Sequence, residues 1–499
     1  MTDRILGAFE RRLRRPEETI VVSRSRRASV ADVDRMARTV AAQLRDLGVG
    51  DGTVVALAAA NGPGFLAGLL AIRRRRCAAL LLGPRTPAAE KTRITGALGV
   101  AVVVECRRAW PRAPSDWVAS PSIGEHASLS PETAVIKLTS GSTGQPRGIV
   151  TPTAALVADE AALATTMGLE PDERILAAIP MSHSYGLSSV VMPALMRRSL
   201  LVVPERGGPL DPLAPARDHE VSFLPTVPAF LQALVKLAES PRAPRSLRLV
   251  ISAGAPLQAS TAAAFRDAYG QPVHVFYGAS ECGGIAFDRI GTAAERGTLG
   301  TPVEGVEVTL EPACGGPAGG GPAGGGPAGG GPAGGGPDAG AAGSGAVVVR
   351  SPAVAAGYFP PAGDPAADAS LGGGCFRTRD LASFRGRELV LESRLDDLIN
   401  VRGKKINPRE IEAVLGRLAG VEEVVVLGVT PPGRGETVVR SFIACRPGEV
   451  CQASVQAWCR RHLARHKIPR SIVLLDAIPR TERGKLDKRA LLAMEPAGG

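Results

Sequence analysis

Residues 138–148 of the chain read Leu138-Thr139-Ser140-Gly141-Ser142-Thr143-Gly144-Gln145-Pro146-Arg147-Gly148. The glycines leave backbone N–H groups unhindered, and the hydroxyl side chains add donors, so the stretch offers what a phosphate requires from a loop. The largely apolar run Ala134-Val135-Ile136-Lys137-Leu138 predicts a buried strand before the loop, and an apolar run resumes at Ile149. We therefore expect the loop at the end of a strand, where α/β sheets bind their ligands.

This loop differs from a Walker A loop, because no Lys-Ser/Thr pair follows its second glycine at the required spacing. Taken alone, an ordinary Gly/Ser turn is an equally good interpretation of the same residues. The motifs farther along the chain favour the phosphate site over the turn.

Strand and helix patterns alternate on both sides of the loop. Residues 29–48 predict a helix with a serine at its start and a glycine at its end, and residues 65–76 predict another helix. Short apolar runs predict strands at 54–60, 77–82, 175–180, 199–204, 221–225, 247–253 and 273–277. This alternation predicts an α/β fold with a parallel sheet.

The length of the chain predicts more than one domain, because 499 residues are too many for a single hydrophobic core. After residues 389–391 the pattern changes to a short α+β arrangement. Its predicted elements are helices at 408–418 and 455–463 and strands at 421–429, 441–445 and 471–475. We predict a large N-terminal α/β domain of several subdomains over residues 1–392 and a small α+β domain over residues 393–499.

A repetitive segment interrupts the large domain. The sequence Pro-Ala-Gly-Gly-Gly recurs four times from Pro317 onward. Its period of five excludes collagen, which needs glycine at every third residue. We expect residues 315–340 to be a flexible loop insertion between strands at 306–310 and 346–350, which would otherwise pair through a tight turn.

Composition limits the possible partners. The net charge is +11, but aromatic residues make up only 4% and no nucleic-acid recognition motif occurs, so we expect no nucleic-acid partner. The basic run 73–76 follows an apolar helix pattern, and we expect a solvated helix end there, where cations meet the negative end of the helix dipole. No apolar run approaches the length of a membrane span.

The eight cysteines are scattered and include no CxxC pair. This distribution favours reduced thiols over disulfides or a zinc site. The N-terminal residues carry arginines without a following apolar core, so the sequence shows no secretory signal. We therefore expect a cytoplasmic protein.

Several further motifs follow the 139–148 loop in order. They are 180–186 (Pro-Met-Ser-His-Ser-Tyr-Gly), 253–257 (Ala-Gly-Ala-Pro-Leu), 277–281 (Tyr-Gly-Ala-Ser-Glu), 376–380 (Phe-Arg-Thr-Arg-Asp), 393–397 (Ser-Arg-Leu-Asp-Asp) with Gly403, and 479–485 (Pro-Arg-Thr-Glu-Arg-Gly-Lys). Over nearly the whole chain this series resembles the adenylate-forming (ANL) superfamily, which includes acyl-CoA synthetases, luciferase-like enzymes and adenylation domains of peptide synthetases.

The resemblance implies a ligase that activates a carboxylic acid with ATP. The acid would attack the α-phosphate to give acyl-AMP and pyrophosphate, and a thiol, coenzyme A in the favoured reading, would then displace AMP. Neither step needs a protein nucleophile, because catalysis is positioning and charge neutralisation around the phosphoryl centre. A stand-alone enzyme that loads a carrier-protein phosphopantetheine is the alternative, and a non-catalytic nucleotide-binding homologue is a third.

The resemblance also implies the nucleotide site. The phosphate-gripping residues would be Thr139, Ser140, Gly141, Ser142, Thr143 and Gly144, with Arg147 as the cation where the family commonly has lysine. Glu281 would hold Mg²⁺ through an oxygen ligand. The other nucleotide contacts would be Gly254, Ala255, Pro256, Tyr277 (on adenine), Gly278, Ser280 (on the α-phosphate), Asp380 (on the ribose) and Arg394. The residue before Asp380 is usually glycine and here is Arg379, which is a departure from the family pattern.

The catalytic residues implied by the resemblance are Lys485, Thr143, Glu281 and His183. Lys485 would bridge the acyl carboxylate and the α-phosphate during adenylation by neutralising both. Asp396 would be the hinge about which the small, mobile C-terminal lid domain turns. Gly403 would let the pantetheine arm pass close to the backbone.

The acid would lie beside His183, which we expect to gate the pocket and orient the carboxylate rather than act as a base, because the acid is already ionised at neutral pH. The predicted pocket residues are His183, Ser184, Phe223, Phe230, Gly254, Gly278, Cys282 and Gly283. Amino-acid-activating members have an aspartate where this chain has Ser184, which cannot neutralise a buried ammonium. We therefore expect a fatty or aryl acid, with fatty acid metabolism as one setting.

Overall fold

The structure is a computed structural model. The residues it describes are 3–106, 108–122, 124–138, 146–204, 213–236, 243–312, 344–361, 368–395, 399–401, 404–430, 437–446, 448–463, 465–481 and 486–494. The chain divides into two units, which are treated separately below. Unit 1 comprises Met1–Thr309, Val348–Thr378 and Arg387–Leu389, and unit 2 comprises Leu310–Val347, Arg379–Gly386 and Val390–Gly499.

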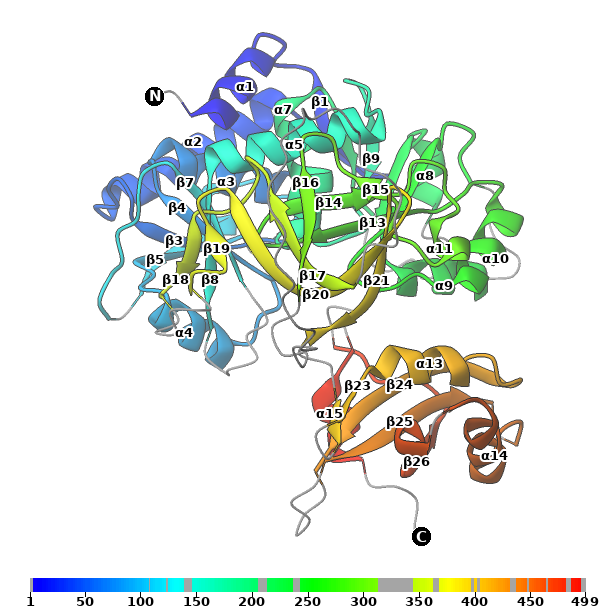
Figure 1. Cartoon of the computed structure of the whole chain (residues 1–499). Coiled ribbons are helices and arrows are strands. Elements are labelled where there is room, and N and C mark those ends of the chain that lie inside the picture. The colour runs from blue at the N-terminus through cyan, green and yellow to red at the C-terminus, as the bar shows by residue number, and fades with distance from the viewer. Residues whose placement is uncertain are drawn as a thin grey trace, which may run out of the picture. The chain divides into compact units, whose positions relative to one another are not determined.

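The first large sheet of unit 1 has seven strands in the order β18-β8-β7-β4-β3-β5-β6 (Figure 1). Their bounds are β3 (Val54–Ala58), β4 (Ala78–Leu82), β5 (Val102–Cys106), β6 (Trp117–Pro121), β7 (Thr133–Leu138), β8 (Gly148–Pro152) and β18 (Gly357–Phe359). The central strands β5, β3, β4 and β7 are parallel, and the outer strands are antiparallel. Every residue of β3 and β4 is buried, which explains why these strands are unbroken apolar runs in the sequence.

The second large sheet has nine strands in the order β15-β14-β13-β12-β11-β9-β10-β1-β2. Their bounds are β1 (Thr19–Val22), β2 (Arg27–Ser29), β9 (Arg174–Leu176), β10 (Leu200–Val202), β11 (Phe223–Thr226), β12 (Leu249–Ser252), β13 (His274–Ala279), β14 (Gly283–Phe287) and β15 (Thr301–Pro302). The six central strands of this sheet, β13, β12, β11, β9, β10 and β1, run parallel. Strands β2, β14 and β15 are antiparallel additions at the edges. The alternating pattern predicted one parallel sheet, whereas the structure has two, each with antiparallel margins that the pattern did not indicate.

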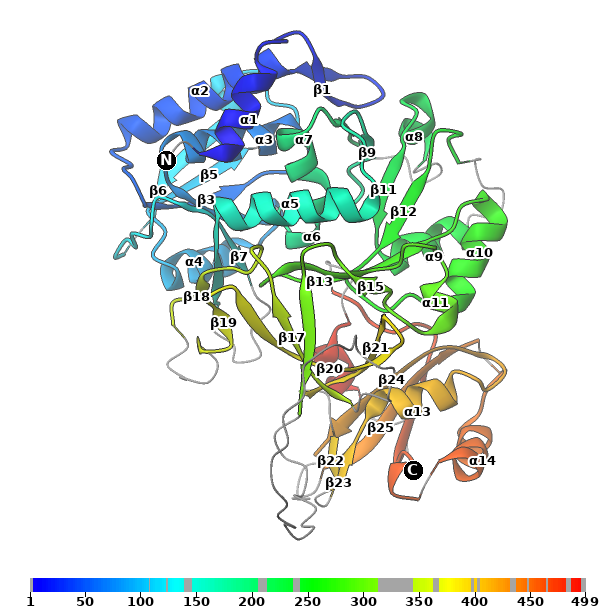
Figure 2. The same cartoon turned by 45° about the horizontal axis from the view of Figure 1, so that its top comes forward.

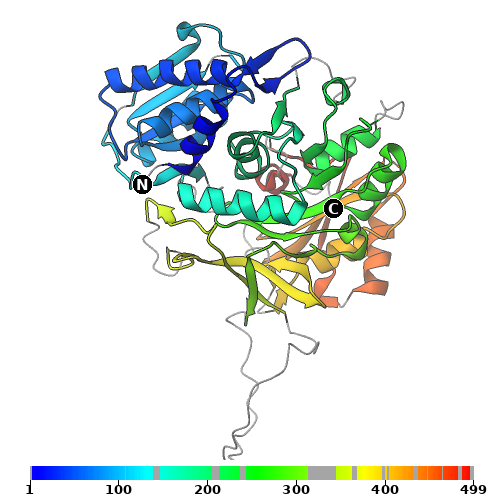
Figure 3. The ribbon, with the colours of Figure 1, turned by 90° about the horizontal axis from the view of Figure 1, so that it is seen from above.

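Helices cover these sheets and link them. They are α1 (Arg4–Arg12), α2 (Val30–Asp46), α3 (Pro63–Arg74), α4 (Ala88–Ala97), α5 (Thr153–Met167), α6 (Ser184–Gly186), α7 (Met192–Met196), α8 (Ala214–Asp218), α9 (Pro228–Lys236), α10 (Ala259–Tyr269) and α11 (Ala293–Arg296), with short turns η1 (Pro114–Asp116) and η2 (Leu187–Val191). Helix α5 contacts β7 and β8 of the first sheet and β14 of the second. It lies in the middle of unit 1 (Figures 2 and 3), so its buried side chains reach both sheets.

The first predicted helix is α2, and its start follows from local chemistry. Ser29 caps it, with its side chain accepting from the backbone N–H of Asp32, and the Asp32 carboxylate accepts from the N–H of Ser29. This capping box satisfies two N–H groups that have no partner within the helix. The second predicted helix is α3, which ends at Arg74.

The expectation of a solvated helix end at residues 73–76 is wrong for Arg73, which is only 2% exposed. Its guanidinium donates to the carbonyls of Cys77 and Thr133 and pairs with Asp3 at 2.9 Å. A planar fork of five donors can satisfy several carbonyls at once, so burial of the charge is compensated here. The charge pattern alone did not reveal this burial, because Asp3 and Thr133 are distant from Arg73 in the sequence.

Unit 2 is built on a three-stranded sheet, β24-β25-β26, with bounds Val421–Val429, Val438–Cys445 and Ser471–Leu475. Successive side chains of a strand point to opposite faces. Accordingly Ile443 belongs to one apolar cluster, and its neighbours Phe442 and Ala444 belong to another. The remaining elements are α13 (Pro408–Leu415), α14 (Gln452–His462), η4 (Arg465–Lys467), α15 (Lys488–Ala493), β22 (Ile399–Val401) and β23 (Lys404–Ile406).

A five-stranded sheet contains the strands along which the chain passes between the two units. Its order is β16-β17-β20-β19 with β21 beside β20, and the bounds are β16 (Glu307–Glu311), β17 (Gly345–Arg350), β19 (Leu371–Gly372), β20 (Cys375–Arg385) and β21 (Glu388–Arg394). As predicted, β16 and β17 are neighbours, and the 315–340 insertion between them lies outside the described residues.

The prediction of an α/β fold with a large N-terminal domain and a small C-terminal α+β domain is confirmed. The boundary between residues 392 and 393 and the mobility of the small domain stay predictions. Cys314 lies outside the described residues, and the other seven cysteines are free. Across the described ranges, no helix has both the length and the apolar character needed to span a membrane.

Candidate active site

The ends of the 139–148 loop are fixed by a hairpin. Strands β7 and β8 pair antiparallel, with Leu138 opposite Gly148. Because β7 is also parallel to β4, the loop leaves the carboxyl end of a parallel strand, as expected for a ligand-binding loop. The predicted phosphate-binding residues Thr139, Ser140, Gly141, Ser142, Thr143 and Gly144 lie outside the described residues.

Arg147, at the far end of this loop, contacts two side chains that are distant in sequence. Its Nη2 atom lies 2.9 Å from Oδ1 of Asp368, and its Cζ atom lies 4.3 Å from the ring centroid of Tyr358. The hydroxyl of Tyr358 donates to Oε1 of Glu281 at 3.2 Å. One tyrosine, which the sequence motifs did not single out, therefore connects the predicted phosphate-site cation with the predicted Mg²⁺ ligand.

The turn between β13 and β14 carries Ser280 and Glu281. Gly278 faces Gly284 across this hairpin, and a Cβ atom on Gly278 would lie 2.6 Å from the carbonyl oxygen of Gly283, so only glycine fits there. Tyr277, Ser280 and Glu281 are half-buried, and Gly278 is exposed.

The structure joins the 180–186 and 277–281 motifs directly. The hydroxyl of Ser184 donates to Oγ of Ser280 at 2.7 Å. His183 immediately precedes α6 and is half-buried. Two residues after His183, the hydroxyl of Tyr185 donates to the carbonyl of Thr226 and accepts from the N–H of Thr226, each at 3.1 Å. Thr226 is the last residue of β11. Burial raises the pKa of Tyr185 far above its ordinary value, so the phenol stays protonated and anchors this segment.

Asp159 on α5 is a second residue that the motifs missed. It is 5% exposed, and its carboxylate accepts from Oγ of Ser188 at 2.5 Å and from the N–H of Gly284 at 2.9 Å. Burial raises the pKa of Asp159, and these two hydrogen bonds oppose the shift. The carboxylate thus ties the segment after His183 to the strand after Glu281.

Lys137 lies at the end of β7 and is 6% exposed. Burial lowers the pKa of its ammonium group, and the charges of Asp159 and Glu281 oppose that shift. A lysine within the apolar run 134–138 was the one sequence signal for a buried charge here. We expect Asp159, as a nearby counter-charge, to lower the cost of burying this ammonium.

The predicted acid-pocket residues differ in their surroundings. Phe223 and Cys282 are fully buried, Phe230 packs at the edge of the apolar cluster around β11 and β12, and Gly254 is exposed with a φ of +84°. Burial raises the pKa of the Cys282 thiol well above its usual value, so the thiol stays protonated. Ala255 is half-buried and Pro256 is exposed beside Gly254.

Unit 2 brings two of the predicted nucleotide residues together. Nε of Arg394 lies 3.2 Å from Oδ1 of Asp380, whose side chain is largely buried. Arg379 is exposed on the same strand, β20. The predicted residues Lys485, Asp396 and Gly403 lie outside the described residues.

The donor set around Glu281 fits Mg²⁺ bound together with ATP. Across the described ranges, no cluster of three or more His, Cys, Asp or Glu side chains forms a closed metal cage. Mg²⁺ typically takes one or two protein carboxylates and completes its shell with substrate phosphates and water. A single half-buried carboxylate at the end of a strand is consistent with that coordination.

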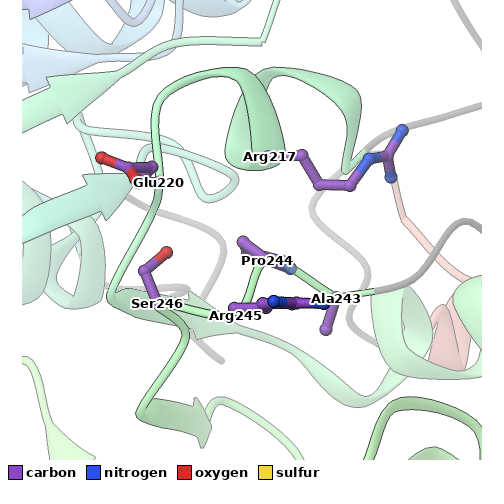
Figure 4. A pocket seen from close by; sticks show the side chains of 6 residues that line it. All are labelled: Arg217, Glu220, Ala243, Pro244, Arg245 and Ser246. Carbon is purple, nitrogen blue, oxygen red and sulfur yellow. The ribbon is translucent and has the colours of Figure 1, made fainter.

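A small open pocket occurs elsewhere in unit 1 (Figure 4). Arg217, Glu220, Ala243, Pro244, Arg245 and Ser246 line it. These residues precede β11 and β12, so the pocket lies at the amino ends of these strands, whereas Thr226 and the site-bearing segments lie at the carboxyl ends. It therefore belongs to a different edge of the sheet from the candidate site.

A loop that follows a parallel strand and a carboxylate reached from it through Tyr358 are consistent with a nucleotide-binding enzyme. Residues 9–359 match the family described as "AMP-binding enzyme", and residues 410–485 match the "AMP-binding enzyme C-terminal domain". The chain belongs to this family of AMP-binding enzymes, which confirms the enzyme class predicted from the motifs.

Proteins whose names are those of CoA ligases or CoA synthetases match most of the chain. A feruloyl-CoA synthase of an Amycolatopsis species is 28% identical over 365 residues, 72% of this chain and 69% of its own length. The Mycobacterium tuberculosis "Long-chain-fatty-acid--CoA ligase FadD13" is 26% identical over 497 residues, 93% of this chain and 92% of its own. The solved o-succinylbenzoate CoA synthetase from Bacillus subtilis, in complex with an acyl-adenylate, shares the fold with a TM-score of 0.77 and 23% identity over 98% of each chain.

Proposed function

We propose that the protein activates a fatty or aryl carboxylic acid with ATP to acyl-AMP, releasing pyrophosphate, and then transfers the acyl group to coenzyme A. The observation that carries the proposal is the contact between the 139–148 loop and Glu281 through Tyr358. It supports a single centre in which a polyphosphate and its metal ion are held together. The named relatives act on aryl and long-chain acids, which is consistent with this substrate range.

In this scheme the side chains of the protein bind and orient the anionic groups of ATP and of the acid. Mg²⁺, when bound, would neutralise the triphosphate, and Glu281 would be its protein ligand. The phosphates would lie along residues 139–144, with Ser280 at the α-phosphate. His183 would orient the acid, and Lys485 would bring the acid carboxylate to the α-phosphate by neutralising both anions.

The acid tail is proposed to be uncharged. Ser184 offers no carboxylate, and its hydroxyl is already bonded to Ser280. Asp159 is a buried carboxylate in the same unit, but its two oxygens already accept hydrogen bonds from Oγ of Ser188 and from the N–H of Gly284. A buried ammonium without a counter-ion costs several kcal/mol, whereas each buried methylene contributes about 0.8 kcal/mol.

A pyrophosphate-exchange assay over a panel of acids tests the proposal. Exchange should rise along straight-chain acids or substituted benzoates until the pocket is full, and each amino acid should give less exchange than its deaminated analogue. An amino acid activated better than its analogue would contradict the proposed pocket. Absence of exchange with every acid would instead favour a non-catalytic nucleotide-binding homologue, for which Arg147 and Arg379 are the departures from the family pattern.

The thiol acceptor is decided by a second step of the same assay. Arg460, Arg461 and Arg470 are exposed in unit 2, and exposed cations suit either the phosphates of coenzyme A or an acidic carrier protein. Acyl-AMP formed in the first step is offered coenzyme A or a holo-carrier. Thioester formation with coenzyme A supports the proposed function, and transfer to the carrier alone supports the alternative.

A further inference from the structure

Tyr358 stands between the two charged groups of the proposed phosphate and metal site. Its hydroxyl donates to Glu281 at 3.2 Å, and its ring lies 4.3 Å from Cζ of Arg147. A cation over an aromatic ring is attracted by the negative face of the ring, which holds the ring in place. Asp368 pairs with the same guanidinium at 2.9 Å and holds the cation in turn.

The backbone around Tyr358 is fixed on two sides. Strand β18 pairs with β8, which sets Tyr358 opposite Ile149 and Phe359 opposite Gly148, directly after Arg147. The N–H of Ala355 donates to the carbonyl of Glu281 itself at 2.8 Å. The segment 355–359 is therefore attached both to the strand that follows the phosphate loop and to the residue whose carboxylate it contacts.

The phenol of Tyr358 donates one hydrogen bond to the Glu281 carboxylate. Because a donated hydrogen bond takes one lone-pair direction of the carboxylate, it also limits how the carboxylate can rotate.

We propose that Tyr358 is a positioning residue that holds the Glu281 carboxylate in the orientation needed for Mg²⁺-ATP, with Arg147 and Asp368 holding Tyr358. This inference rests on the proposed function, in which Glu281 is the Mg²⁺ ligand. It concerns the orientation of a carboxylate on the half-buried turn between β13 and β14. Preorganised ligands bind a metal more tightly because less conformational freedom is lost on binding.

The test is calorimetric titration of ATP into the full-length protein without acid, in excess Mg²⁺ and in EDTA. The ratio of the two dissociation constants measures the Mg²⁺-dependent gain in affinity. Tyr358→Phe removes the hydroxyl and keeps the ring, and should lower this gain about 3- to 10-fold, the usual range for one hydrogen bond, with ATP binding in EDTA unchanged. Tyr269→Phe is the matched control, because it removes a buried hydroxyl that donates to the carbonyl of Leu234 on α9; it should leave the gain unchanged.

Glu281→Gln separates this inference from the function on which it rests. If Glu281→Gln removes the gain and Tyr358→Phe keeps it, the positioning role of Tyr358 is wrong and the metal assignment stands. If Glu281→Gln keeps the gain, the metal assignment falls and the role of Tyr358 falls with it. Equal weakening by Tyr358→Phe in Mg²⁺ and in EDTA would indicate general damage to the site and would also overturn the inference.

Discussion

At the scale of single residues, Gly283 shows how closely the turn after Glu281 packs against Asp159 of α5. Its backbone φ is +73°, a value that residues with a Cβ atom rarely adopt. A Cβ atom added to Gly283 would lie 2.2 Å from Oδ1 of Asp159. The next residue donates its N–H to the same carboxylate. The turn that carries Glu281 therefore requires glycine at position 283 as well as the hydrogen bond from Gly284 to Asp159.

Gly283→Ala should lower the free energy of unfolding by about 2–4 kcal/mol, from backbone strain together with the clash, and should reduce pyrophosphate exchange. Gly305→Ala is the control, because Gly305 has the same φ of +73° and nothing within 4 Å of the added methyl group. It should show only the backbone cost, about 1 kcal/mol. Thermal melting and the exchange assay measure both effects; equal losses in the two variants would show that contact with Asp159 is unimportant.

Lys485 is the residue on which the resemblance places the first half-reaction. Lys485→Ala should lower acyl-AMP formation by more than about 100-fold, as expected when a charge-neutralising group is lost from the transition state. Thioester formation from supplied acyl-AMP should be largely retained. Arg489→Ala removes an exposed neighbouring cation and should leave both steps intact. Equal loss of both half-reactions in Lys485→Ala would contradict its assignment to adenylation alone.

At the scale of elements, helices α2 and α3 are joined through Asp34. Its carboxylate lies 2.7 Å from Nε of Arg38 and also pairs with Arg74 at the end of α3. Burial alone would raise the pKa of Asp34, but the hydrogen bonds and charges of Arg74 and Arg38 outweigh it and lower the pKa below 3.8. Between the folded and unfolded pKa the unfolded chain binds more protons, so the contribution of Asp34 to stability grows as pH rises.

Asp34→Asn should therefore lower the free energy of unfolding by about 1–3 kcal/mol at pH 7, the range for hydrogen bonds to charged groups. The difference from the wild type should shrink as pH falls below about 4 and through the lowered folded pKa. Asp46→Asn, at the exposed end of α2, removes only a surface pair with Arg45 and should have little effect at any pH. Denaturant unfolding at several pH values measures this. A difference that stays constant from pH 7 to pH 3 would show that ionisation of Asp34 is not the cause.

At the scale of the whole molecule, the repetitive insertion is predicted to be dispensable. Strands β16 and β17 are neighbours in their sheet, so their pairing does not require the sequence between them. Deletion of residues 316–336 should leave the melting temperature and turnover nearly unchanged, because shortening a loop changes its closure entropy only slowly with length. A loss of more than about tenfold in turnover, about 1.4 kcal/mol on the barrier, would show that the segment has a further role. Replacement by a Gly/Ser segment of equal length separates length from sequence.

The elements and the order of the motifs were predictable from the sequence because their causes are local. Strands β3 and β4 are buried on both faces and therefore consist of unbroken apolar residues, and α2 starts where Ser29 and Asp32 satisfy its first N–H groups. The functional motifs were recognisable because glycines, hydroxyls and charges occur at fixed spacing. These signals do not depend on how the strands are ordered in the sheets.

The contacts between motifs depended on the tertiary structure. Ser184 meets Ser280, Asp159 meets Gly284, and Tyr358 meets Glu281, each across a long separation in sequence. These contacts follow from strand order and register: β18 beside β8, and α5 against strands of both sheets. The same reason explains why Arg73 is buried rather than solvated. Its partners come from neighbouring segments, and a side chain's burial and hydrogen bonds are fixed by which segments pack against it, which the spacing of residues along the chain does not encode.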